Sequence, residues 1–171
     1  MPDFDILKER LETIEKFDDG DFTWGELCKI ERDSYNVNDF FDILVKPVGM
    51  LSGQLGVKFN AKISHPWLNR YDRGGFQEIH YHDDCDIAAV VFLNDGEDFS
   101  KFYFWDSNHT AFTKPWIKIL TQMKLSNVYY PEVKAGDVLL FPSHMLHGVS
   151  PHNCDIIRET FSFNVVVTNV E

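Results

Sequence analysis

Residues 158–165, Arg-Glu-Thr-Phe-Ser-Phe-Asn-Val, alternate between polar and apolar side chains. In a β-strand this period of two places Phe161, Phe163 and Val165 on one face and the polar side chains on the other. The segment therefore predicts a strand with one face in a core. An inward Arg158 could bind a carboxylate, because the guanidinium fork matches both carboxylate oxygens. The alternative is a surface arginine on an edge strand.

The same period extends upstream to about residue 57, with Gly, Pro, Asn and Asp clusters between short segments. Short strands at this spacing, without alternating helices, favour a two-sheet sandwich or jelly roll. Residues 109–125 read as a partly helical insertion. The predicted strands cover residues 57–63, 67–72, 76–84, 87–93, 101–105, 127–132, 137–141 and 159–168.

The first third of the chain has helical periodicity. A first helix is expected to end at Asp18-Asp19-Gly20, and Thr23 begins a capping-box spacing that predicts a second helix. A third helix is expected from about Asn38 to Leu55, with Pro47 as a kink or a break. The apolar stripe of the first helix consists of Phe4, Leu7, Leu11, Ile14 and Phe17.

These patterns predict a single domain over residues 1–171, without an internal repeat or a linker. A helical N-terminal layer, residues 1–56, backs a mainly β core, residues 57–171. The hydrophobic fraction of 44% and the charged fraction of 25% are typical of a globular protein and exclude wholesale disorder.

Charge and targeting signals narrow the possible functions. Sixteen basic and 27 acidic residues give a net charge of −11, which opposes binding to phosphate backbones, so no nucleic-acid partner is expected. The longest apolar run, residues 87–93, is far shorter than the ~20 residues of a membrane span. The acidic N-terminus and three cysteines without CxxC spacing favour a soluble protein of a reducing compartment, the cytoplasm by default.

The densest polar cluster is His80-Tyr81-His82-Asp83-Asp84. On the strand predicted at 76–84, His80, His82 and Asp84 share a face. Imidazoles and carboxylates bind divalent transition metals, and two histidines with one carboxylate form the facial set of non-haem iron(II). The alternative is a solvated strand end, since short runs of histidine and aspartate also occur by chance.

A second cluster follows residues 136–143, which predict a tight turn and a buried strand that ends at Pro142. His144 and His147 come next, and a histidine just past a strand can meet a distant His/Asp pair across a sandwich. The two clusters together favour a three-ligand metal site over isolated core or surface histidines.

In this order the motifs resemble those of the 2-oxoglutarate- and iron(II)-dependent dioxygenases, most closely the prolyl-hydroxylase-like branch with its short bacterial and phage members. The resemblance extends over roughly residues 57–168 and implies a double-stranded β-helix, a cupin-like jelly roll. Its specificity lies in the ordered combination of segments. These segments are YDRGGF at 71–76, HxD at 82–84, the apolar strand at 87–94, GDVLLFPS…HGV at 136–149 and RETFSFN at 158–164.

The resemblance implies Fe(II), 2-oxoglutarate and O2 as cofactor and cosubstrates. It implies that oxidative decarboxylation of 2-oxoglutarate to succinate and CO2 is coupled to hydroxylation of a substrate. No catalytic residue beyond the metal centre is implied. The residues that match the family are His82, Asp84 and His147 as iron ligands, Arg158 with Thr160 for the far carboxylate of 2-oxoglutarate, and Tyr71 as a hydroxyl donor to the cosubstrate.

His80 offers a second register for the metal, in which His80, His82 and His147 form a three-histidine site and Asp84 is not a ligand. The spacing from Asp84 to the apolar strand at Ile87 favours the carboxylate set, with His80 then a nearby pocket residue. A neutral three-histidine set would leave the metal more positive, which could change its redox behaviour.

Two other classes of protein fit part of the pattern. Gly74-x5-His80-x-His82 and Gly136-x5-Pro142-x4-His147 also resemble the two cupin motifs, so the alternative is a metal-binding cupin or dioxygenase that does not use 2-oxoglutarate. A non-catalytic barrel that binds a partner is the third possibility. The Arg158 strand favours the oxygenase. Specificity in such folds lies in loops and insertions, so only a small-molecule or peptide substrate is predicted.

Overall fold

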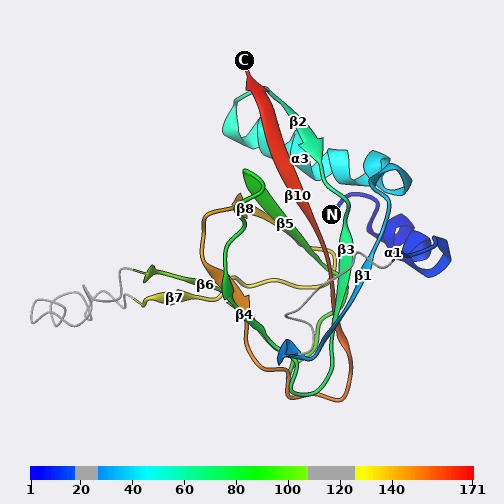
Figure 1. Cartoon of the computed structure of the whole chain (residues 1–171), viewed down its shortest axis with the longest axis vertical. Coiled ribbons are helices and arrows are strands. Elements are labelled where there is room, and N and C mark those ends of the chain that lie inside the picture. The colour runs from blue at the N-terminus through cyan, green and yellow to red at the C-terminus, as the bar shows by residue number, and fades with distance from the viewer. Residues whose placement is uncertain (18–26, 108–125) are drawn as a thin grey trace, which may run out of the picture.

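The computed structural model of the chain describes residues 1–17, 27–107 and 126–171, and two antiparallel sheets form its centre (Figure 1). The predicted two-sheet architecture is therefore confirmed. The larger sheet has the order β1 (Ile30–Ser34), β3 (Trp67–Tyr71), β10 (Arg158–Val170), β5 (Ile87–Phe92) and β8 (Val138–Pro142), with β2 (Phe59–Ile63) also paired to β10. The smaller sheet has the order β4 (Gln77–His80), β9 (His147–Val149), β6 (Phe102–Trp105) and β7 (Val128–Tyr129).

Strand β10 organises the larger sheet. Its 13 residues pair with β3 and β2 along one edge and with β5 along the other. Arg158 lies opposite Tyr71, and Thr160 lies between Asn69 and Phe92. Since neighbouring side chains of a strand point to opposite faces, this register decides which residues of β10 face the space between the sheets.

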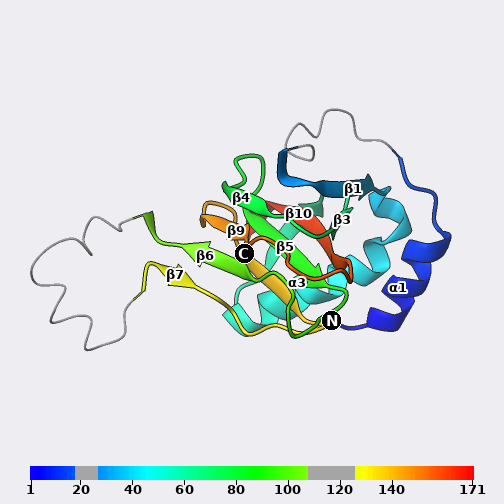
Figure 2. The same ribbon diagram turned by 90° about the horizontal axis from the view of Figure 1, so that it is seen from below.

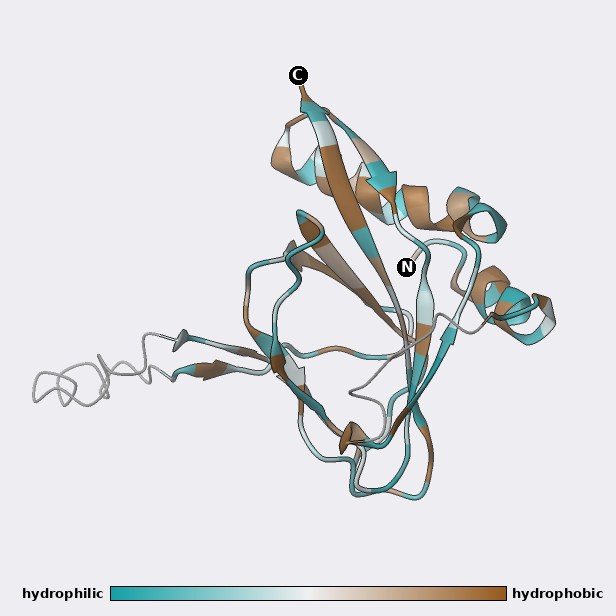
Figure 3. Cartoon of the chain, viewed as in Figure 1, coloured by the Kyte–Doolittle hydropathy of each residue, from teal (hydrophilic) through white to brown (hydrophobic). Residues whose placement is uncertain are grey.

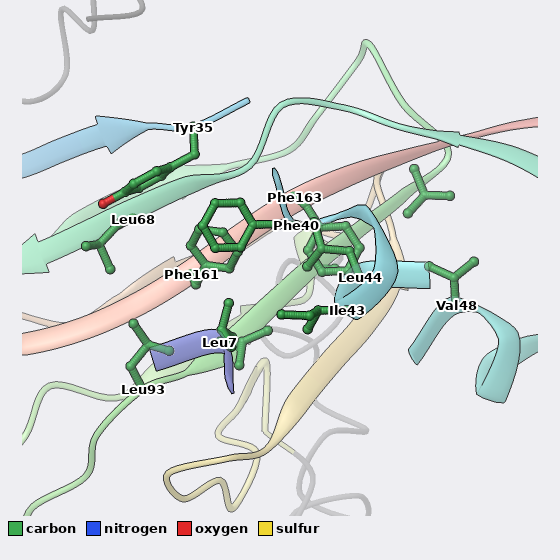
Figure 4. Packing of buried hydrophobic residues seen from close by; sticks show 13 residues of the cluster. Leu7, Tyr35, Phe40, Ile43, Leu44, Val48, Leu68, Leu93, Phe161 and Phe163 are labelled. Atoms are coloured by element: carbon green, nitrogen blue, oxygen red, sulfur yellow. The ribbon is translucent and has the colours of Figure 1, made fainter. Parts of the chain in front are cut away.

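Two helices, α1 (Phe4–Thr13) and α3 (Phe41–Leu55), cover the outer face of the larger sheet. Phe161 and Phe163 of β10 are fully buried there, against Leu7 of α1 and the side chains that precede and begin α3 (Figure 4). The rings of Phe40 and Phe161 lie 5.2 Å apart. Hydrophobic residues accordingly concentrate on β5, β10 and α3 (Figure 3). The predicted N-terminal helices are present and back the sheet, but residues 1–56 are not purely a helical layer, because they also contain β1 of the larger sheet.

The helix boundaries differ from the expected ones. Helix α1 ends at Thr13 rather than near Asp18, and Phe17 instead forms a β-bridge with Ser34. Helix α3 continues through Pro47 without a break. Its buried face compensates for the hydrogen bond that proline removes, because packing supplies most of the stability of such a helix. The start of the helix expected at Thr23 lies outside the described residues. None of the described helices has the length and apolarity to cross a membrane.

The strands also differ in two respects. The predicted strand 76–84 is too long, because β4 ends at His80. The chain turns there, and the amide of His82 donates to the carbonyl of Ser143 at 3.0 Å. Two strands were missed: β1, in the part read as helical, and β9, which has only three residues. The whole insertion predicted at 109–125 lies outside the described residues. Strands β6 and β7, which flank it, project away from α1 at the opposite end of the molecule (Figure 2).

Candidate active site

A cavity of about 460 Å³ opens between the two sheets. The polar face of β10 forms one wall, and Arg158, Thr160, Ser162 and Asn164 all line it, as the alternation of residues 158–165 predicts. Along the wall the side chains run from the buried Arg158 to Asn164 near the turn after β4. A sheet face buried between two sheets is usually apolar, whereas this one is polar. The polar face favours binding of a polar ligand over packing of apolar side chains.

Three histidines converge in this cavity. His80 ends β4 and His147 begins β9, and they are directly paired residues of adjacent strands with ring centroids 4.2 Å apart. The ring of His82, just past β4, stacks on that of His147 at 5.2 Å and an angle of 10°. One ring nitrogen from each histidine lies within 4.8 Å of those of the other two. Because imidazole nitrogens bind a metal at about 2.1 Å, small side-chain shifts suffice to bring all three onto one ion.

The protonation of the histidines suits metal binding. The Nδ1 atoms of His80 and His147 lie 2.8 Å from the carbonyl oxygens of Glu78 and Met145. A carbonyl only accepts, so Nδ1 carries the proton and the lone pair lies on Nε2. Burial lowers the pKa of His80, lowers that of His82 to about 4 and lowers that of His147 to about 3. All three rings are therefore neutral at pH 7, the form that binds a metal ion.

Aromatic side chains hold the His147 ring from two sides. The rings of Phe102 and Phe141 lie 5.5 Å and 4.8 Å from it. Both phenylalanines are buried in the cluster between the sheets. They fix the orientation of the imidazole and exclude water from its surroundings, which accounts for the low pKa of His147.

Asp84 lies in a different group. Its carboxylate, the thiol of Cys85 and a ring nitrogen of His82 lie within 4.8 Å of one another. Asp84 is exposed, and it accepts a hydrogen bond from the side-chain amide of Asn164 at 3.4 Å. Since β4 ends at His80, the alternation that would align all these side chains on one face stops before Asp84. The structure thus brings together the three histidines of the second register and groups Asp84 with only one of them.

Arg158 defines the inner end of the cavity. It is 3% exposed, and its guanidinium lies 4.9 Å from the ring of Tyr71 and 5.7 Å from that of Phe92. No carboxylate in the described part of the chain pairs with it, and its Nη1 atom is buried without a hydrogen-bond partner. An unpaired buried charge is costly, so this guanidinium fits an anionic ligand such as a carboxylate of 2-oxoglutarate.

Two buried hydroxyls stand beside this guanidinium. Tyr71 interacts with both Thr160 and Arg158, and both hydroxyl residues are at most 3% exposed. Burial raises the pKa of Tyr71, so its hydroxyl stays protonated and can donate a hydrogen bond. Arg158, Tyr71 and Thr160, the three residues predicted to bind the cosubstrate, therefore form one cluster. A carboxylate of 2-oxoglutarate would be the anionic partner of this cluster.

The other end of the cavity contains Arg32, which sequence reasoning missed. Arg32 of β1 stacks on Trp67 of β3 with its Cζ 4.5 Å from the ring, and the Trp67 ring lies 6.4 Å from that of His82. Asn69 and His65 also line the cavity. The segment around Arg32 contains only one strongly apolar residue, Ile30, so its strand had no visible alternation. His144 is exposed and does not line the cavity.

Solved structures identify the class of this fold. The chain is similar to HygX from Streptomyces hygroscopicus, solved with nickel and 2-oxoglutarate bound (TM-score 0.65, 16% identity, covering 97% of this chain and 78% of that chain). It is also similar to an oxidoreductase of the 2OG-Fe(II) oxygenase family from Burkholderia pseudomallei, with a TM-score of 0.67 and 11% identity, covering 95% of this chain and 77% of that chain. A prolyl-4-hydroxylase from Pseudomonas putida is similar too, with a TM-score of 0.57 and 15% identity, covering 96% of this chain and 84% of that chain. The fold is the double-stranded β-helix of 2-oxoglutarate oxygenases, as the resemblance implied.

The sequence itself gives the family. A family model described as "Putative 2OG-Fe(II) oxygenase" matches residues 65–164, more than half of the chain. The protein belongs to this 2OG-Fe(II) oxygenase family and is an iron(II)- and 2-oxoglutarate-dependent oxidoreductase. No curated protein matches the sequence. The predicted family, fold and cofactors are confirmed, and the cupin and the non-catalytic barrel are set aside.

Proposed function

We propose that this oxygenase holds iron(II) through His80, His82 and His147 and binds the far carboxylate of 2-oxoglutarate through Arg158. One observation carries the proposal: three neutral, converging imidazoles line the same cavity as a buried guanidinium whose Nη1 atom has no hydrogen-bond partner. Iron(II) bound with 2-oxoglutarate and O2 supplies the oxidising chemistry, which yields succinate, CO2 and a hydroxylated substrate.

The chain's own contribution is positioning. The guanidinium of Arg158 can donate two parallel hydrogen bonds to one carboxylate, and the hydroxyls of Tyr71 and Thr160 can add further donors. Charge-assisted hydrogen bonds are strong in a buried site, because no water competes for the donors. The aromatic wall formed by Phe102 and Phe141 keeps the His147 end of the cavity dry.

The competing ligand set is His82, Asp84 and His147. It requires Asp84 to leave Asn164 and turn toward the other two side chains. The three-histidine set needs only small shifts, because its nitrogens already lie within 4.8 Å of one another. The geometry therefore favours His80 over Asp84 as the third ligand.

The substrate in this proposal is a small molecule or a peptide that enters past Arg32 and Trp67 and reaches the histidines. The cavity is too small for a folded domain but sufficient for a side chain or a metabolite-sized ligand. The net charge of −11 disfavours nucleic acid as the substrate.

Anaerobic titration tests this function. Addition of iron(II) and then 2-oxoglutarate to the purified protein is expected to produce a weak visible metal-to-ligand charge-transfer band, which reports chelation of iron by the keto acid. Arg158→Ala is expected to lose the band at moderate 2-oxoglutarate concentrations, whereas the exposed control His144→Ala keeps it. Iron binding without any such band in the unmodified protein would contradict the proposal.

A further inference from the structure

Asn94 follows strand β5 and holds the start of β10 through its side chain. The pairing of β5 with β10 ends at Phe92, which lies opposite Thr160. Beyond that pair, the side-chain amide of Asn94 donates to the carbonyl of Ile157 at 2.8 Å, and its side-chain oxygen accepts from the amide of Glu159 at 2.9 Å. One side chain thus supplies the donor and the acceptor that a paired strand residue would supply from its backbone.

The two backbone groups that Asn94 binds belong to the residues on either side of Arg158. On the other edge of β10, Arg158 is paired with Tyr71 of β3. Asn94 therefore takes the place of β5 on one edge, while β3 holds the opposite edge. Without the Asn94 side chain, two backbone groups would lose their partners, and this end of β10 would be held along one edge only.

The position of Arg158 matters because its side chain lines two cavities. The second cavity, of about 630 Å³, lies beyond the end of β5, and Phe92 and Asn94 line it together with Arg158. The carboxylate side chains in its lining are those of Asp95, Glu97, Glu132 and Asp137. A guanidinium that turned toward these carboxylates would gain charged partners there and would no longer face the cosubstrate.

We propose that Asn94 is a positioning residue for 2-oxoglutarate: by holding the backbone on both sides of Arg158, it directs the guanidinium into the cavity of the three histidines. Asn94 does not line that cavity itself, so its effect on the cosubstrate passes through Arg158. The inference rests on the proposed contact of Arg158 with the far carboxylate of 2-oxoglutarate.

Pyruvate is the probe that isolates this effect, because it has the 2-oxo acid group of 2-oxoglutarate but no far carboxylate for Arg158. Anaerobic titration of the iron(II)-loaded protein, followed by the charge-transfer band, gives the Kd of each acid. The unmodified protein is expected to bind 2-oxoglutarate about 30-fold more tightly than pyruvate, because only 2-oxoglutarate pairs with the buried guanidinium. Asn94→Ala should raise the Kd of 2-oxoglutarate by about tenfold and leave the Kd values of pyruvate and of iron(II) unchanged.

Two further variants complete the experiment. Asn60→Ala is the matched control, since Asn60 is an exposed asparagine of β2 at the other end of β10, and it should keep the full preference for 2-oxoglutarate. If Asn94→Ala does not fold, Asn94→Asp keeps the acceptor for the amide of Glu159 and loses the donor to Ile157, so it should lose part of the preference.

The pattern across the two acids separates the possible outcomes. An undiminished preference for 2-oxoglutarate in the folded Asn94 variants, or an equal loss of affinity for both acids, would overturn the positioning role of Asn94. An unmodified protein that binds the two acids equally well would refute the proposed contact of Arg158 with the cosubstrate, and this inference with it.

Discussion

The imidazoles of His80 and His147 lie 4.2 Å apart because the two residues are directly paired across strands β4 and β9. This pairing makes the proposed metal centre a consequence of strand register, since a slip of one residue would turn one ring to the other face of the sheet. The iron of the proposed site would join two strands that lie far apart in the chain.

His80→Ala is expected to weaken iron(II) binding by more than about 100-fold, because a direct ligand contributes more than the outer partners of metal ligands. Asp84→Ala should leave iron affinity nearly unchanged, since its carboxylate lies in the group with Cys85. Anaerobic calorimetric titration measures both, with His144→Ala as the control histidine variant. The reverse result, iron lost with Asp84 and kept without His80, would assign the carboxylate set instead.

Arg158→Met is expected to have opposite effects on ligand binding and on stability. Loss of a buried charge partner should raise the Kd for 2-oxoglutarate by about 30-fold or more. The apoprotein, freed of an unpaired buried charge, should gain about 1 kcal/mol in free energy of unfolding.

Thermal unfolding with and without cosubstrate checks both effects of Arg158→Met. The iron-loaded unmodified protein should gain Tm with 2-oxoglutarate, and the variant should not, because a ligand stabilises only the state that it binds. Iron binding itself should persist in the variant. A variant that keeps its cosubstrate-dependent gain in Tm would remove Arg158 from the binding site.

The stability of the apoprotein should fall as the pH is lowered below about 6.5. The folded pKa of His82 is about 4 and that of His147 about 3, both below the ordinary 6.5, so the unfolded chain binds more protons in this range. The stabilisation is complete above pH 6.5 and is lost progressively toward these folded pKa values. Denaturant unfolding across this window should give a smaller slope for His82→Gln, and an equal slope would contradict the assigned shift.

The two faces of β10 should respond differently to substitution. Phe161→Ala is expected to reduce the free energy of unfolding by about 3–5 kcal/mol, because the ring is fully buried under the helices. Thr160→Val, one residue away on the other face, should weaken 2-oxoglutarate binding by about tenfold with little effect on stability. Chemical denaturation and cosubstrate titration of both variants measure the contrast. A stability loss of equal size in both would contradict the assignment of faces.

The hydrophobic periodicity of single strands and helices predicted which of their faces are buried. The alternation of residues 158–165 predicted that Arg158 and Phe161 lie on opposite faces of one strand, and the structure places Arg158 in the cavity and Phe161 in the core. The helix stripe that contains Leu7 likewise predicted the buried face of α1. The cytoplasmic location and the absence of a nucleic-acid partner stay predictions.

Long-range contacts account for what the sequence did not reveal. The choice between His80 and Asp84 depends on where β4 ends, and hydrogen bonds from the turn to Ser143 and Val165 determine that end. Arg32 was missed for a similar reason, since β1 is a strand only because it pairs with β3. The order of residues within β1 or within the turn after β4 does not indicate which distant residues they pair with.

Strand β10 lies in the middle of the larger sheet, between β5 on one edge and β2 and β3 on the other. The ribosome synthesises the chain from the N-terminus, so β2, β3 and β5 are made before β10, the strand that joins them. Until β10 has emerged, the sheet lacks its centre and the chain lacks Arg158. A nascent chain that has not yet added β10 therefore lacks both the strand that joins the sheet and the guanidinium proposed to bind the cosubstrate.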